Sequence, residues 1–216
     1  MVIRPTGPLR RGRPRNAPDG SRERLLEAAL DLFARHGIAA TSLNAIAVRA
    51  RVTPAMLHYH FGGREALLDA LVAERLTPVM AAPIGQIAAA AGDARALVHG
   101  LIEAVYGAVE ANPWLPPLWV REVLSDGGHL RERLLNGPIS AVAPRLCDAI
   151  TREQKRGAIN TDLDPRLTVV SLIGLTLFPF AAQSIWRRVF KAGDVTHQTM
   201  LRHTLALLDH GLELKR

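Results

Sequence analysis

The stretch that decides the fold is Thr41 to Phe61, which reads TSLNAIAVRARVTPAMLHYHF. A hydroxyl at Thr41 or Ser42 can accept a hydrogen bond from a free N–H of a first helical turn, so either residue suits a helix N-cap. Apolar residues follow at helical spacing and define one face. The residues of this stripe are Leu43, Ile46, Ala47 and Ala50. The sequence therefore predicts a short helix that buries the stripe.

A second short helix is predicted directly after the first. Thr53 is a second capping residue, and Pro54 stands at the first helical position, where a missing N–H costs nothing. Leu57 and Phe61 lie one turn apart and are predicted to point into the core. The outward residues are then Ala55, Met56, His58, Tyr59 and His60. Two short helices joined by a tight turn form a helix-turn-helix, whose second helix reads base edges of DNA.

This segment resembles the DNA-binding domain of the TetR family of transcriptional regulators. The likeness covers about residues 21–72, whereas the rest matches the family only in length and helical character. Two residues depart from the family pattern. Arg51 stands where glycine is usual, so a left-handed backbone there would carry strain. His58 stands where tyrosine is more frequent. The matching residues are Thr41, Ser42, Leu43, Ile46, Ala47, Ala50, Val52, Thr53, Leu57, His58, Tyr59, His60, Phe61, Arg64, Glu65 and Leu67.

The resemblance implies which residues meet DNA. Arg64 and the hydroxyls of Thr41 and Ser42 are expected at phosphates, and the outward face of the second helix at bases or flanking phosphates. Ala55 and Met56 are suited to thymine methyl groups. A metal site at His58-x-His60 is not favoured, because residues i and i+2 do not share a helix face. The expected DNA-binding residues here are Thr41, Ser42, Thr53, Ala55, Met56, His58, Tyr59, His60 and Arg64.

The net charge of +7 is concentrated at the N-terminal end of the 216-residue chain. Residues 1–64 hold 11 Lys and Arg against 4 Asp and Glu, whereas residues 65–216 hold 16 of each kind. Residues 1–20 are rich in proline and glycine and are predicted to form a flexible basic arm. Its Arg11-Gly12-Arg13-Pro14-Arg15 resembles AT-hook peptides, so Arg11, Arg13 and Arg15 are expected in the minor groove. The alternatives are a solubilising tail and an arm that stays disordered on DNA.

An all-α fold is predicted, with an N-terminal three-helix domain and a larger helical domain for ligand binding and dimerisation. The expected domains are the arm at 1–20, the helix-turn-helix domain at 21–66 and the regulatory domain at 67–216. A first helix over 21–36 should end at Gly37, with Phe33, Ile46, Leu57 and Phe61 at the core centre. Asp93 and Asp194 are predicted caps. Further helices are expected at about 64–76, 78–90, 94–111, 117–125, 129–135, 138–156, 165–187 and 194–213.

The helices at about 165–187 and 194–213 resemble the family's dimerisation pair. Independently of that likeness, apolar residues nearly surround the first of them, so it must be covered on all sides. The alternative is that both helices belong to the core of a monomer. We expect a homodimer, because two recognition helices one DNA turn apart can read a palindrome.

A small-molecule effector is implied by the resemblance. The candidate ligand-binding residues are His99, Glu103, Tyr106, Trp119, Glu122 and Phe178. Each can equally be a structural residue. Glu103 or Glu122 in an apolar cavity would favour a cationic ligand and Arg121 an anionic one, and the sequence does not decide between them.

No enzyme motif is present among those for nucleotide binding, thiol redox chemistry, zinc hydrolysis or serine hydrolysis, so no enzyme, cofactor or metal is expected. Cys147 is the single cysteine, which fits a reducing compartment. We interpret it as a small buried apolar residue, with a redox sensor as the alternative. No apolar segment follows the charged N-terminus, and the apolar run at 167–182 is short for a membrane span. We expect a cytoplasmic protein without membrane contact.

Together these features predict a ligand-responsive transcriptional regulator that binds a palindromic operator as a dimer and leaves it when an inducer binds. Repression is the default that the resemblance implies. An architectural DNA-binding protein is the alternative, and it would show little sequence preference.

Overall fold

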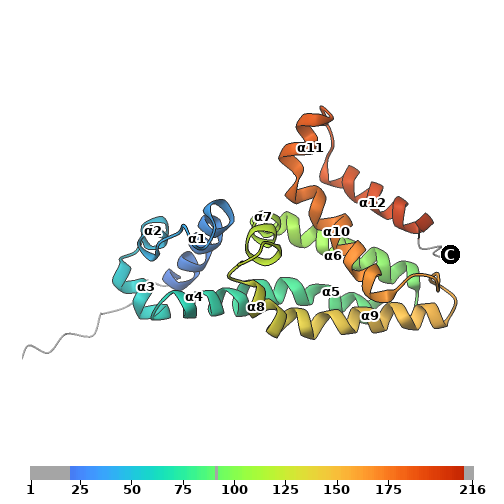
Figure 1. The fold of residues 1–216 in the computed structure, drawn as a ribbon, viewed down its shortest axis with the longest axis horizontal. Helices are drawn as coiled ribbons and strands as arrows, with labels where there is room; N and C mark the ends of the chain where they lie inside the picture. Colours follow the sequence, from blue (N-terminus) through green and yellow to red (C-terminus); the bar gives the residue numbers. More distant parts are fainter. Residues whose placement is uncertain (1–19, 91, 212–216) are drawn as a thin grey trace, which may run out of the picture.

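The computed structural model describes residues 20–90 and 92–211, and all regular elements among them are helices (Figure 1). The three N-terminal helices, α1 to α3, are named the head here, and α4 to α12 the body. Figure 1 shows the head at one end of an elongated molecule. The predicted all-α fold is confirmed.

The head contains the two predicted short helices and the helix that packs on them. They are α1 (Ser21–His36), α2 (Leu43–Arg49) and α3 (Pro54–Phe61). Ser42 caps α2, since its Oγ accepts from the Ala45 N–H at 3.1 Å, and Thr53 caps α3 by accepting from the Met56 N–H at 3.3 Å. Arg51, in the turn between α2 and α3, has a φ of 56°, so the backbone there is left-handed and the condition under which an arginine carries strain is met.

The core of the head lies where the sequence predicts it. Phe33, Ile46 and Leu57 are at most 1 % exposed, and Phe61 is buried beside them. Removing this apolar surface from water is what holds the three helices together, because α2, with 7 residues, and α3, with 8, are too short to be stable alone.

A single long helical segment leads from the head into the body. It consists of α4 (Arg64–Leu71), a π-helical turn (Val72–Leu76) and α5 (Thr77–Ala89). The predicted division into separate helices at 64–76 and 78–90 is therefore wrong. Pro78 cannot donate a backbone bond, yet the π turn absorbs the irregularity, because the N–H and the hydroxyl of Thr77 both donate to the Val72 carbonyl.

The body packs its helices around a second apolar core. The helix predicted at 94–111 is confirmed as α6, and Asp93 caps it by accepting from the Ala96 N–H at 3.0 Å. A second π-helical turn, Val120–Leu124, follows α7, and the segment Leu135–Ile139 after α8 contains a kink at Gly137, whose φ of −132° and ψ of −113° are not helical. In Figure 1, α5 and α9 run side by side beneath α6 and α10. The helices are α6 (Ala94–Ala111), α7 (Leu115–Trp119), α8 (Arg131–Leu134), α9 (Ser140–Lys155) and α10 (Pro165–Ala181).

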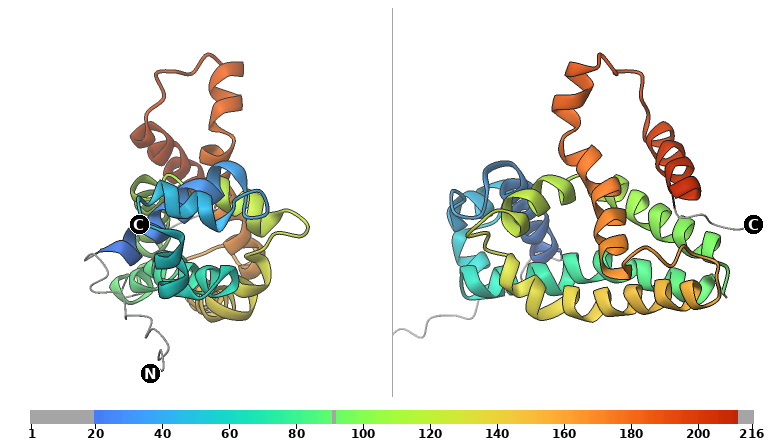
Figure 2. Two further views of the ribbon diagram at one scale, coloured as in Figure 1. Left: turned by 90° about the vertical axis from the view of Figure 1, so that its left-hand side faces the viewer. Right: turned by 45° about the vertical axis from the view of Figure 1, so that its right-hand side comes forward.

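The helix predicted at 165–187 is two helices, α10 and α11 (Gln183–Val189), which meet at 71°. Pro179 has no N–H to donate, and its own carbonyl accepts from the indole N–H of Trp186 at 2.7 Å instead of continuing the ladder. Both views in Figure 2 show α11 and the following loop projecting from the rest of the body, and α12 (His197–Gly211) then leads back toward it.

The last helix begins later than predicted. Asp194 is not its cap, because Thr196 supplies the oxygen that accepts from the Thr199 N–H at 3.1 Å. Residues 212–216, the end of the predicted range, lie outside the described residues.

No single helix of the described chain has the length and apolar character to cross a bilayer, and only the bent pair α10–α11 meets those two criteria together.

Candidate nucleic-acid interface and ligand cavity

The recognition helix α3 presents a mixed polar and apolar surface to solvent. Tyr59 is 64 % exposed, Ala55 and His58 are also exposed, and Met56 is half-buried. The Nδ1 of His58 lies 3.0 Å from the Gly62 carbonyl, one turn further on. This bond fixes the ring against the end of α3, so the other ring nitrogen is directed away from that carbonyl.

The three predicted hydroxyl contacts differ in accessibility. Ser42 and Thr53 are exposed at the starts of α2 and α3, where free N–H groups and a hydroxyl favour an anion. Thr41 is buried, and its hydroxyl donates to the Gly37 carbonyl at 2.7 Å. We therefore remove Thr41 from the phosphate-binding set, since its side chain closes the loop between α1 and α2.

Two further predicted DNA contacts are engaged within the protein. The Nε2 of half-buried His60 lies 2.7 Å from the Oγ of Ser21, which ties α3 to the start of α1. The guanidinium of Arg64 donates to the Ile38 carbonyl at 2.7 Å and to the Thr41 carbonyl. Arg64 therefore joins the first turn of α4 to the loop before α2, a role that sequence reasoning missed.

Arg11, Arg13 and Arg15 belong to residues 1–19, which lie outside the described part of the chain.

The ligand-binding prediction needs correction at three residues. Glu103 is exposed, and His99 is bonded through Nε2 to Asp209 on α12 at 2.7 Å. Glu122 is buried, with 4 % of its surface exposed, but it contacts the head instead of the cavity described below. None of the three lines that cavity.

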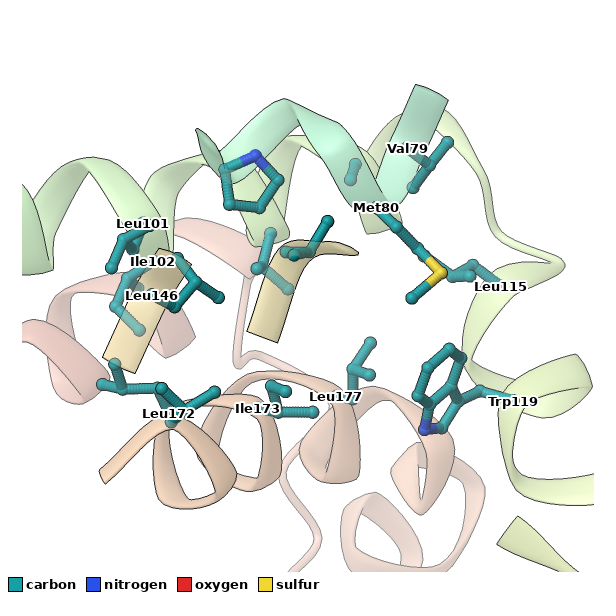
Figure 3. Close-up of a pocket in the computed structure, with 15 residues that line it drawn as sticks. Val79, Met80, Leu101, Ile102, Leu115, Trp119, Leu146, Leu172, Ile173 and Leu177 are labelled. Atoms are coloured by element: carbon teal, nitrogen blue, oxygen red, sulfur yellow. The ribbon is translucent and has the colours of Figure 1, made fainter. Parts of the chain in front are cut away.

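Apolar side chains from five helices line a partly open cavity of about 130 Å³ in the body. In Figure 3, Val79 and Met80 of α5 form one wall, and Leu172, Ile173 and Leu177 of α10 face them. Trp119 closes one end and is the one predicted ligand residue found here. The full lining is Val79, Met80, Pro83, Leu101, Ile102, Val105, Ala108, Leu115, Trp119, Val142, Leu146, Val169, Leu172, Ile173 and Leu177.

Sequence reasoning missed this wall because it searched for polar and aromatic residues. The signal was present in α10, whose apolar residues occupy every face. Such a helix needs partners all round, and one partner can be a ligand instead of protein. With no charged side chain in the lining, a cationic or anionic ligand would lose hydration without compensation.

Tyr106 and Phe178 border a second hollow, of about 480 Å³, between α10, α11 and α12. Tyr106 is buried, and its hydroxyl lies 2.9 Å from the Oγ1 of Thr204, while burial raises the pKa of the phenol. Phe178 is 68 % exposed. Large apolar side chains are exposed along α10, α11 and α12, the segment predicted to dimerise, and together they are called the apolar surface of these helices. That surface includes Leu167, Val170, Phe178, Ile185, Val189, Phe190 and Leu207.

A buried carboxylate joins body and head. Glu122 accepts from the Ile38 N–H of the head at 2.8 Å and from the backbone N–H of His129 at 3.2 Å. Its neighbour Arg121 donates to the Arg35 carbonyl at the end of α1 at 2.9 Å. Arg121 and Glu122 lie two and three positions after Trp119 in the chain. One short segment therefore links the cavity wall to the head.

Ion pairs also fasten the head to the long α4–α5 segment. Arg22 of α1 pairs with Glu74 in the π turn, which lowers the pKa of that carboxyl, and it lies over the Phe61 ring. Arg133 of α8 pairs with Glu65 and Asp69 of α4. α1 therefore holds the π turn of the α4–α5 segment, and α8 holds the beginning of α4.

An exposed recognition helix, capped at a helix-turn-helix and joined to a helical body with an apolar cavity, defines a DNA-binding regulator. Two family models match the chain: "Bacterial regulatory proteins, tetR family" over residues 25–71, and "Tetracyclin repressor-like, C-terminal domain" over residues 95–209. The second alone spans more than half of the 216 residues. The chain belongs to the TetR family, whose members are transcription factors and not enzymes.

Relatives of full length are also found. The HTH-type transcriptional repressor KstR2 of Rhodococcus jostii (strain RHA1) is 25 % identical over 196 residues, 89 % of this chain and 91 % of the relative. The solved ketosteroid transcriptional regulator KstR2 of Mycobacterium tuberculosis has a TM-score of 0.69 at 23 % identity, covering 93 % of this chain and 98 % of that one.

The solved fatty acid degradation regulator FadR from Bacillus halodurans has a TM-score of 0.71 at 18 % identity, and the match covers 93 % of this chain and 100 % of that one. These two structures show that the fold is shared.

Proposed function

We propose that this regulator is a repressor that binds a palindromic operator as a homodimer and leaves it when a neutral, apolar small molecule occupies the body cavity. The observation that carries the proposal is the α5 wall of that cavity. Val79, Met80 and Pro83 line it, and the same helical segment begins at Arg64 against the head. A ligand that displaces this wall therefore moves the support of the recognition helix.

The size of the cavity supports a mechanism of this kind. A dry cavity of about 150 Å³ in another protein accepts benzene, so the 130 Å³ here has room for a small hydrocarbon without rearrangement. A larger ligand must push the surrounding side chains apart. It shifts the protein to a second state only if it binds that state more tightly than the first.

The names of the relatives give the ligand class a direction. One structure is titled a ketosteroid regulator and another a fatty acid degradation regulator. Steroid rings and acyl chains are both hydrocarbon bodies that suit a lining without charge. We therefore favour a mainly hydrocarbon effector over a cation, the alternative that Glu103 or Glu122 in the cavity would have required.

Dimerisation is supported by the apolar surface of α10 to α12. Large side chains such as Phe178 and Phe190 are more than two-thirds exposed in the single chain. Several large apolar side chains left exposed on successive helices are typical of a protein interface. We propose that the same surface of a second copy covers it, because a two-fold interface pairs one patch with itself.

The test begins with selection of bound sequences from random DNA. We expect an inverted repeat with half-sites about one helical turn apart, bound at least ~10³-fold more tightly than random duplex. Sedimentation at micromolar concentration should give a dimer. An architectural protein would enrich no defined sequence, and that outcome would contradict the proposal of a sequence-specific repressor.

Release is tested on the selected operator with matched probes. A neutral steroid ketone and a neutral fatty acid methyl ester should each dissociate the complex, whereas a hydrophobic cation of similar size should not. Release by the cation alone would contradict the proposed ligand class and leave DNA binding intact.

A further inference from the structure

Arg51 occupies a backbone conformation that suits glycine. Its φ is 56°, and six of the eight described residues with positive φ are glycines. The left-handed region brings the Cβ of any other residue close to its own carbonyl, so an arginine here costs conformational energy that a glycine would avoid. A strained residue that persists invites the question of what its side chain does.

The fold does not need the Arg51 side chain. The turn is closed by backbone bonds alone, from the Arg51 N–H to the Val48 carbonyl and from the Val52 N–H to the Ala47 carbonyl, both at 3.0 Å. The side chain is exposed, and it forms no ion pair or hydrogen bond with the described residues. Glycine would supply the same backbone bonds.

The neighbouring arginines of the head differ from Arg51. Arg35 and Arg49 are also exposed, but both pair with the one carboxylate of Asp31, so each has an acidic partner within the head. Arg24 of α1 is exposed as well, and its Nε donates to the Ala50 carbonyl at 3.3 Å. Two guanidinium groups therefore lie at the same helix-turn-helix turn.

The position of this turn relates it to the DNA-reading surface. Arg51 precedes the α3 cap Thr53 by two residues, and α3 enters the major groove with its N-terminal residues toward the bases. Gly20, where the basic N-terminal segment joins the head, accepts from the Arg24 N–H at 3.1 Å. Because the Arg24 side chain also bonds to the Ala50 carbonyl, the turn lies close to the start of α1 as well as to the start of α3.

We propose that Arg51, with Arg24 beside it, binds a DNA backbone phosphate at the edge of the half-site. A guanidinium presents parallel N–H donors that match two phosphate oxygens. Such a contact fixes the position of α3 and carries no sequence information of its own. The inference rests on the proposed DNA-binding function and adds a contact that the family pattern, with glycine at this position, does not contain.

The experiment compares Arg51→Gly and Arg51→Gln with the wild type on the selected operator. Both variants should bind about 3- to 10-fold more weakly near physiological salt, with the slope of log affinity against log salt reduced by roughly 1. Arg51→Gly should also raise the thermal midpoint by roughly 2–4 °C, because it relieves the strain. Arg51→Gln keeps the strain and should not raise it.

The matched control is Arg152→Gln on α9, which removes the same charge from an exposed position on the body. It should leave both affinity and salt slope unchanged. Wild-type affinity and slope in Arg51→Gly would overturn the proposal and show a tolerated strain without function. If the wild type itself selects no operator, the proposed function fails instead, so the two failures are distinguishable.

Discussion

The head and the body differ in how their interiors are filled. In the head, Phe33, Ile46 and Leu57 are sealed among three short helices. The body leaves a cavity of about 130 Å³ inside and residues such as Phe178 and Phe190 exposed outside. An unfilled interior and exposed residues on α10 to α12 are what the proposed ligand site and the proposed contact with a second copy require of the body.

The largest expected effect is on stability, and the same Leu→Ala substitution should cost more in the core of the head than in the cavity wall of the body. Leu57→Ala in the sealed head should cost about 3–5 kcal/mol and abolish operator binding, because every contact of the lost methyl groups was made by protein. Leu101→Ala in the cavity wall should cost about 2–3 kcal/mol, since one side of Leu101 already faces empty space. Chemical unfolding of each variant, followed by circular dichroism, measures the pair. Equal losses would show that the cavity wall is packed as tightly as the head.

Glu122→Gln should weaken the connection between the two regions. The amide would place an NH₂ against a backbone N–H of Ile38 or His129, leaving a buried donor unsatisfied at a cost of about 1–3 kcal/mol. Hydrogen exchange at the Ile38 amide should accelerate while exchange within α6 stays unchanged. Glu103→Gln, an exposed acid on α6, is the control. Unaltered exchange at Ile38 would argue against the carboxylate as a joint.

Ala108→Leu should fill the body cavity without touching the head. Its added carbon atoms enter space that is already empty, so we expect a gain of about 1–2 kcal/mol and the loss of xenon binding measured by NMR. Ala111→Leu, exposed at the end of α6, should retain xenon binding. Xenon binding that survives in Ala108→Leu would place the binding site elsewhere in the protein.

The smallest effect concerns acid stability at the joint between α1 and the π turn. Arg22 holds the pKa of the Glu74 carboxyl below its ordinary value of 4.5. The pair therefore contributes fully above pH 4.5, and its contribution is lost as pH falls through the lower folded pKa. Because both side chains are partly exposed, Glu74→Gln should lower stability near pH 7 by only a few tenths of a kcal/mol, with ~1 as the upper limit.

Unfolding curves of the wild type and Glu74→Gln at a series of pH values give this measurement, with Glu103→Gln as the reference acid. The two stabilities should converge below pH 4.5. A constant difference down to the lowest pH would assign the effect to packing instead of charge.

The sequence by itself determined the head. Ser42, Thr53 and Pro54 fix helix starts through bonds between neighbours in the chain, and the stripe that includes Ile46 fixes the buried face. Local rules suffice there because caps and helical periodicity involve residues a few positions apart. The same rules placed α6 from Asp93 to the end of the helix, whereas the left-handed backbone at Arg51 became known only from the structure.

Only the tertiary structure decided what the polar residues do and where the cavity lies. Glu122 was a candidate ligand residue until Ile38, 84 positions away, turned out to donate to it, and Thr41 turned its hydroxyl inward to Gly37. The bend after Pro179 and the five-helix cavity likewise arise from contacts between distant segments. A side chain's type limits the bonds it can form, but the partner comes from whichever element the fold brings beside it.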